Sequence, residues 1–248
     1  MFLLGDIGNT DIKICLYNNN KKLVKKIKLE TNLISNKLIK KNLKSVILKK
    51  YKIQKAVFCS VVPAIYKKIK IILKKNFKIK STELKDINLS KIINIKVNRK
   101  QVGSDRLSNA ISVIDNKNNY IIVDFGTATT FDIVIKNQYL GGIISPGVNL
   151  SLSTLISKAS MIPNMKLKTV KKILGKNTLH AVRSGFYWGY SGLIINVINK
   201  ILNQTKKKYK IVLTGGLSHF FKNVIPYKVS IDRNLTMNGL LKVVHLIN

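Results

Sequence analysis

Acidic residues are scarce in this 248-residue chain, which has 10 Asp and Glu side chains against 45 Lys and Arg. The formal net charge of +35 suits nucleic-acid binding, since clustered basic side chains are its electrostatic signature. Arginine, which base-reading proteins favour for bidentate contacts, is nearly absent, with four residues. The lysines are scattered among isoleucines and asparagines, as codon usage in an AT-rich genome would produce. We therefore interpret the charge as a compositional bias and expect no specific nucleic-acid partner.

Cysteines and long apolar runs are also rare. Cys15 and Cys59 lie far apart, without the spacing of a zinc site or a disulfide framework, and we expect both to be buried in strands. Polar residues interrupt every apolar stretch before it reaches the roughly 20 residues of a membrane span. Asp6 stands where a signal peptide would continue its apolar segment. These absences predict a cytoplasmic protein with no membrane partner.

A P-loop is missing as well. Gly175 and Lys176 are followed by Asn177, where the motif requires Ser or Thr, and Val170 occupies the place of the first glycine. A nucleotide, if bound, is therefore held in another manner. Hydrophobic residues nevertheless make up 46% of the chain, enough for a substantial core.

The hydrophobic pattern predicts an α/β protein built from two related halves. Residues 2–16 alternate around a glycine-containing turn and read as a β-hairpin. A second such hairpin spans 120–135. Each hairpin is followed by a third strand, a helix, a strand and a helix, although the two sequences are barely alike. We predict two β-β-β-α-β-α halves, at residues 1–115 and 116–248.

Each half opens with a turn that combines an acid, a glycine and a threonine. The first is Asp6-Ile7-Gly8-Asn9-Thr10, and the second runs from Asp124 to Thr130. After a buried strand, such a turn can cradle the phosphates of ATP, with Asp6 holding a hydrated Mg²⁺. An Asx turn in an ordinary hairpin would explain one motif. Two motifs that open equivalent halves favour a nucleotide site.

The ordered set of motifs resembles type III pantothenate kinases. Besides the two turns, it contains Gly103-Ser104-Asp105-Arg106, the loop from Gly141 to Gly147, Gly175-Lys176-Asn177-Thr178 and Thr214-Gly215-Gly216. The match covers essentially the whole chain. It implies a duplicated ribonuclease-H-like fold of the actin-like ATPase superfamily, with the active site in the cleft between the halves.

The resemblance also implies an activity. These kinases transfer the ATP γ-phosphate to pantothenate, giving 4′-phosphopantothenate in the first step of coenzyme A biosynthesis. They act as homodimers and use a monovalent cation, K⁺ or NH₄⁺, beside Mg²⁺. The aromatic run from Phe186 to Tyr190 lies among glycines in a predicted long helix, and we expect it at the dimer interface.

Site residues follow from the resemblance position by position. ATP would be bound by Asp6, Ile7, Gly8, Asn9, Thr10, Asp11, Ile12, Lys13 and Thr127. Pantothenate would be contacted by Gly103, Ser104, Asp105, Arg106 and Thr178. Asp105 would be the catalytic base, and Asp124 would bind the monovalent cation. The chain departs from the family at Lys96, where an aromatic residue that contacts the substrate is common.

Two other functions use the same fold. One is a DNA-associated transcriptional accessory factor, and the other is a kinase of a different sugar or acid. Fold alone does not decide between them. A binding protein has no need of Asp6, Asp105 and Asp124 together, which favours an enzyme, and the Gly103–Arg106 match is the main evidence for pantothenate as acceptor.

Because the positive charge is diffuse and poor in arginine, we predict only weak, salt-sensitive and sequence-independent binding of nucleic acid. Fluorescence anisotropy with labelled duplexes, in competition with random DNA at physiological salt, measures this. A sequence bound far more tightly than the competitor would contradict the prediction and weaken the preference for an enzyme.

Overall fold

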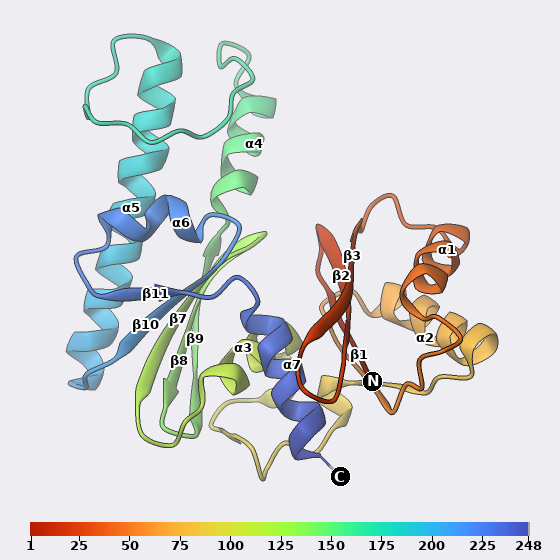
Figure 1. Cartoon of the computed structure of the whole chain (residues 1–248). Coiled ribbons are helices and arrows are strands. Elements are labelled where there is room, and N and C mark those ends of the chain that lie inside the picture. The colour runs from red at the N-terminus through yellow and green to blue at the C-terminus, as the bar shows by residue number, and fades with distance from the viewer. Residues whose placement is uncertain (248) are drawn as a thin grey trace. The chain divides into compact units, whose positions relative to one another are not determined.

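Two β-sheets with equivalent strand orders organise the chain in the computed structural model, which describes residues 1–247 (Figure 1). The strands are β1 (Phe2–Ile7), β2 (Asp11–Tyr17), β3 (Leu23–Glu30), β4 (Lys55–Ser60), β5 (Ser81–Glu83), β6 (Asn94–Ile95), β7 (Asn119–Phe125), β8 (Ala128–Ile135), β9 (Gln138–Pro146), β10 (Lys210–Gly215) and β11 (Val229–Ile231). The helices are α1 (Asn36–Val46), α2 (Pro63–Phe77), α3 (Ser104–Val113), α4 (Val148–Lys158), α5 (Thr178–Thr205), α6 (Ser218–Phe221) and α7 (Leu235–Leu246). Short 3₁₀ turns are η1 (Leu84–Asp86), η2 (Arg99–Gln101) and η3 (Lys222–Val224).

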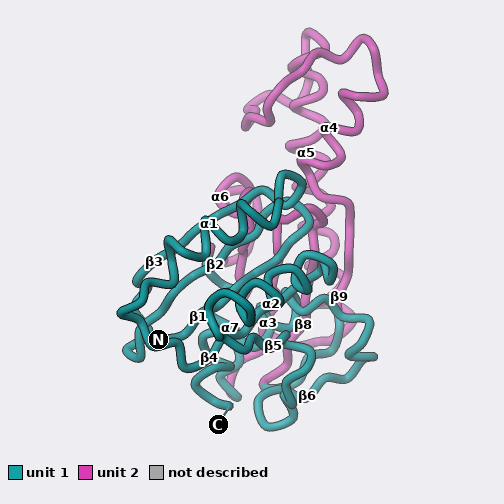
Figure 2. The backbone as a smooth tube through the Cα atoms, turned by 90° about the vertical axis from the view of Figure 1, so that its right-hand side faces the viewer, with its two compact units in different colours: residues 1–116, 137–141, 234–248 teal, residues 117–136, 142–233 magenta. Residues whose placement is uncertain are grey.

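The chain divides into two units, coloured separately in Figure 2. Unit 1 contains residues 1–116, residues 137–141 and the C-terminal segment that begins at Asn234. Unit 2 contains residues 117–136 and 142–233. These compact units do not test whether the chain consists of two repeated halves. The halves 1–115 and 116–248 therefore stay a prediction.

The sheet of unit 1 has the order β3-β2-β1-β4-β5. Strand β1 pairs antiparallel with β2 and parallel with β4. Alternation along β1 sends Leu3 and Ile7 to one face of the sheet, where they join the core formed with α1 and α2. Leu4 and Asp6 point to the opposite face. This alternation decides on which side of the sheet an acid at position 6 can act.

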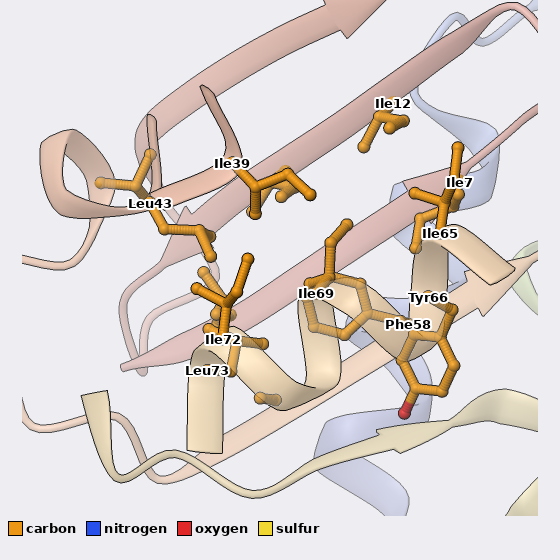
Figure 3. Close-up of a cluster of buried hydrophobic side chains, with 14 of the residues drawn as sticks. Ile7, Ile12, Ile39, Leu43, Phe58, Ile65, Tyr66, Ile69, Ile72 and Leu73 are labelled. Carbon is orange, nitrogen blue, oxygen red and sulfur yellow. The ribbon is translucent and has the colours of Figure 1, made fainter. Parts of the chain in front are cut away.

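The apolar face of unit 1 is shown in Figure 3. Ile69, Ile72 and Leu73 of α2 pack there against strand residues, and each lies at a helical spacing that keeps it on one side of α2. Phe58 of β4 lies opposite Gly5 in the parallel register, and a Cβ at Gly5 would come 2.1 Å from the Phe58 ring. The glycine therefore makes room for an aromatic side chain in the core.

Helices α3 and α7 pack against each other and contact the other face of the same sheet. The rings of Phe2 and His245 meet edge to face at 4.9 Å. A Cβ at Gly239 would lie 1.9 Å from the Ser108 carbonyl oxygen, so the two helices approach closely. Lys55 Nζ donates a hydrogen bond of 3.0 Å to the Val244 carbonyl near the end of α7. These contacts hold α7 against β1, β4 and α3.

The sheet of unit 2 repeats this design with the order β11-β10-β7-β8-β9. Strand β7 pairs antiparallel with β8 and parallel with β10, and β10 pairs parallel with β11. Strands β7 to β11 thus follow the order of β1 to β5, and β7, β8, β10 and β11 also pair in the same directions as β1, β2, β4 and β5. The first residues of β9, which belong to unit 1, pair in parallel with β6. Helix α5 lies along the core of unit 2, to which Ile194 and Ile198 contribute.

The predicted α/β class and both hairpins are confirmed. Cys15 and Cys59 are free and buried in strands, as expected. The pattern missed β5, β6 and β11, since two or three residues are too few to show a period. None of the helices within residues 1–247 is both long and apolar enough to span a bilayer.

Candidate active site

Asp6 lies near the end of β1, on the face contacted by α3 and α7. In the sheet it stands opposite Lys13 of β2 and Cys59 of β4. Lys13 Nζ lies 3.7 Å from Asp6 Oδ2, and the Cys59 thiol donates a hydrogen bond of 3.6 Å to Asp6 Oδ1. The register of three strands thus surrounds one carboxylate with an ammonium group and a thiol.

Asp105 is the second residue of α3. Its Oδ1 accepts a hydrogen bond of 2.8 Å from the backbone N–H of Arg106, and the positive end of the helix dipole favours a carboxylate in this turn. A Cβ at Gly103 would lie 2.4 Å from the same oxygen. Glycine at 103 therefore allows the carboxylate to fold back over the start of the helix.

The two carboxylates influence each other. Burial raises the pKa of Asp6 above its ordinary value, and the charge of Asp105 raises it further, whereas Lys13 and the thiol of Cys59 act in the opposite direction. Burial also raises the pKa of Asp105, against the lowering effect of the Arg106 N–H and guanidinium. The structure thus brings together three predicted site residues, Asp6, Lys13 and Asp105, in unit 1. A pair of partly buried acids with perturbed pKa values is typical of a site of chemistry.

Three further residues of this region escaped the sequence analysis. Burial raises the pKa of the Cys59 thiol well above its ordinary value, so the group stays protonated and remains a donor to Asp6. Glu83 accepts the backbone N–H groups of Ser60 at 3.2 Å and Lys85 at 2.5 Å. The sequence offered one usable signal, the position of Cys59 and Ser60 at the end of an apolar strand parallel to β1.

The predicted phosphate turn is well ordered by its own contacts. Gly8 N–H donates to the Asp11 carbonyl at 2.9 Å, and Thr31 Oγ1 donates to the Gly8 carbonyl at 2.8 Å. The side chains of Asn9 and Thr10 are exposed at the tip. Ile7 and Ile12, also predicted to contact ATP, have side chains buried in the core. Only their backbone groups could contact a ligand. Asp11 forms an ion pair of 2.9 Å with Lys28.

The residues predicted to contact pantothenate occupy both units. Gly103 to Arg106 form the start of α3 in unit 1, whereas Thr178 is the exposed first residue of α5 in unit 2. Asn177 caps that helix by accepting the His180 N–H at 2.9 Å. Lys96, the departure from the family, is exposed directly after β6 and donates its backbone N–H to Tyr139 at 2.9 Å.

The second hairpin places Asp124 in the position that Asp6 holds in unit 1. Asp124 stands opposite Thr130 of β8 and Thr214 of β10. Gly215 has a φ of +85°, and a Cβ there would lie 2.7 Å from Asp124 Oδ1. The glycine lets the end of β10 approach the carboxylate. Thr127 is exposed beyond it, so the predicted nucleotide and cation contacts of unit 2 share one hairpin.

Within the described part of the chain, no group of three or more His, Cys, Asp or Glu side chains is placed to hold a metal ion. Asp6 still suits Mg²⁺, which commonly keeps several waters and binds through one or two carboxylates. A cation there would favour the charged form of Asp6, which burial and the charge of Asp105 disfavour. The residues present therefore fit a hydrated ion beside Asp6.

Known sequences similar to this chain belong to the type III pantothenate kinase family. The sequence model of the type III pantothenate kinase family matches residues 2–200. A type III pantothenate kinase from Pelagibacter ubique strain HTCC1062 is 53% identical over 247 residues, covering 100% of both chains. One from Desulfosudis oleivorans is 32% identical over 248 residues and covers 97% of both.

Solved structures show the fold. A protein from Campylobacter jejuni, named as a transcriptional activator of the Baf family, aligns with a TM-score of 0.63 at 20% identity, covering 98% of this chain and 97% of the other. Component A of (R)-2-hydroxyglutaryl-CoA dehydratase from Acidaminococcus fermentans aligns with a TM-score of 0.56 at 12% identity, covering 97% and 95%. Together with the two equivalent strand orders, these alignments confirm the predicted duplicated ribonuclease-H-like fold.

Replacing Asp105 by Asn should stabilise the protein at neutral pH. The folded state raises the pKa of this carboxyl, so its contribution to stability is complete below the unfolded pKa and is lost as the pH rises through the folded pKa. Asn mimics the protonated form at every pH. Thermal unfolding should therefore show a higher Tm for Asp105→Asn at pH 7, with a difference that shrinks toward pH 3.

Asp86→Asn is the control, because the Asp86 side chain is exposed. Its Tm should stay close to that of the parent. A lower Tm for Asp105→Asn at pH 7 would show that the ionised carboxylate stabilises the fold.

Proposed function

This chain belongs to the type III pantothenate kinase family, and from that membership we infer that it phosphorylates pantothenate with ATP. It is an ATP-dependent phosphotransferase with an alcohol acceptor, and 4′-phosphopantothenate is its product. The 53% identity over full length carries this conclusion. The transcriptional alternative is not favoured, because the relative so named shares only the fold.

We propose that Asp105 is the general base. The observation that supports this is its carboxylate, partly buried at the start of α3 within electrostatic reach of Asp6. Arg106 N–H holds Oδ1, and we assign the proton transfer to Oδ2. The hydroxyl of pantothenate gives its proton to Asp105 as its oxygen bonds to the γ-phosphorus. The bond from that phosphorus to the β,γ-bridging oxygen breaks, and ADP leaves.

Asp6 and its turn are proposed to bind the phosphates. The exposed tip at Asn9 and Thr10 offers neutral hydrogen-bonding groups, and Lys13 adds a positive charge beside Asp6. Mg²⁺ held through water at Asp6 would supply charge neutralisation for the phosphate oxygens. Thr127 is proposed as a further nucleotide contact. Arg106 suits the carboxylate of pantothenate, which Gly103, Thr178 and the backbone of Ser104 would help to bind.

Asp124 is proposed to bind a monovalent cation, K⁺ or NH₄⁺. Its neighbours in the sheet are Thr130 and Thr214, whose hydroxyl groups are neutral, whereas Asp6 stands beside Lys13. Neutral hydroxyl oxygens next to a carboxylate are ligands that suit such a cation.

The active enzyme is proposed to be a cytoplasmic homodimer that pairs through α5. Gly185, Gly189 and Gly192 lie exposed along this helix with open space where a Cβ would be, which permits close approach of another helix. The predicted aromatic interface needs refinement, since Tyr187 is buried in unit 2 against Phe220.

Asp105→Asn should reduce kcat by at least roughly a hundredfold, because Asn caps a helix nearly as well as Asp but cannot take the proton. ATP binding should persist. Steady-state assays that detect 4′-phosphopantothenate measure the change, and calorimetry measures nucleotide affinity. A variant with near-normal kcat would reduce Asp105 to a helix-capping residue.

Activity should depend on potassium or ammonium through Asp124. The rate in potassium should exceed the rate in tetramethylammonium, which is too large to enter a small oxygen-lined site. Asp124→Asn should abolish the difference, while Asp86→Asn should keep it. Equal rates of the parent enzyme in the two salts would rule out the cation site.

A further inference from the structure

Ser104, the first residue of α3, is fully buried. Its hydroxyl donates a hydrogen bond of 3.0 Å to the Ser60 carbonyl and accepts one of 2.7 Å from the Ser60 N–H. One side chain thus closes a two-bond ring with a residue 44 positions earlier. The Ser104 O–H group already donates to the protein backbone, and the buried hydroxyl oxygen is not accessible to a substrate.

Ser60 is the last residue of β4, so these bonds join the end of a strand to the start of a helix. Glu83 adds to the junction by accepting the same Ser60 N–H at 3.2 Å. Since the amide is shared between two acceptors, loss of the hydroxyl would leave this N–H with a partner. The Ser60 carbonyl would lose its bond from Ser104.

The junction lies between the two acids. Cys59, which donates to Asp6, directly precedes Ser60, and Asp105 directly follows Ser104. The Ser60–Ser104 bonds therefore set the spacing between the strand that holds one carboxylate and the helix that carries the other.

We propose that Ser104 is a positioning residue that fixes the Asp105 carboxylate relative to Asp6, and that its side chain does not contact pantothenate. This inference rests on the proposed role of Asp105 as base. Small displacements of a catalytic group slow the reaction strongly, since a misplacement of about 1 Å can lower the rate about a hundredfold. Ser104 would thus affect the chemical step and leave substrate affinity unchanged.

The test compares Ser104→Ala with Ser108→Ala. Ser108 lies in the same helix, is equally buried, and donates its hydroxyl to the Thr236 carbonyl at 2.7 Å. Ser104→Ala should lower kcat about tenfold, with KM for pantothenate within about twofold of the parent. Ser108→Ala should keep kcat. Ser104→Cys, which retains a weak donor, should recover part of the loss.

A second readout is the pH dependence of kcat. Freed from the junction, Asp105 becomes more accessible to water, which relieves the burial that raises its pKa. The acidic limb of the profile should move to lower pH in Ser104→Ala and stay in place in Ser108→Ala. A raised KM with normal kcat would instead identify Ser104 as a substrate contact and overturn the proposal.

Amide hydrogen exchange separates this proposal from the base assignment. With the 2.7 Å acceptor removed and the longer 3.2 Å contact to Glu83 remaining, the Ser60 N–H should exchange about tenfold faster in Ser104→Ala, whatever Asp105 does chemically. Unchanged exchange and unchanged kcat would overturn the junction. Faster exchange combined with normal activity of Asp105→Asn would keep the junction but remove the base, and with it the catalytic role of Ser104.

Discussion

Two partly buried carboxylates within electrostatic reach of each other are the constraint around which unit 1 is arranged. Burial disfavours the charged form of both, and the charge of Asp105 adds to this at Asp6, so each needs compensating groups. Asp6 has the ammonium of Lys13 and a thiol, and Asp105 has a helix start. These groups come from three strands and one helix, and they meet because β1 and β4 run parallel beneath α3 and α7. An arrangement that opposes stability in this way is characteristic of sites retained for chemistry.

The same backbone design places an acid at the end of a strand in each of the two units. Position 6 and position 124 hold the same place in equivalent hairpins. Their neighbours differ, with Lys13 and Cys59 around one carboxylate and threonines around the other. Duplication therefore preserved the place of the acid at the carboxyl end of a strand. Substitution of a few adjoining residues changed the charge of its surroundings.

Local patterns allowed most of the fold to be predicted, because hairpin alternation, glycine turns and amphipathic helices are visible within about 15 residues. The motif residues Asp6 and Asp105 were also found, through their glycines and through family resemblance. The contributions of Cys59, Ser60 and Glu83 were not, since parallel pairing and tertiary packing bring them to the site from distant segments. Tyr187 was assigned to an interface together with the whole aromatic run, although it is buried within unit 2. Four aromatic residues within five positions point to several sides of a helix, so the run alone does not show which of them face the core.

Gly5 and Phe58 show how the core ties neighbouring strands together in evolution. The Phe58 ring occupies the space that a side chain at position 5 would need. A larger residue at 5 is thus accessible only together with a smaller one at 58, since either change alone leaves a clash or a void. Among homologues, the side-chain volumes at positions 5 and 58 should therefore vary inversely. The residue next to Asp6 would change only when its partner on β4 changes with it.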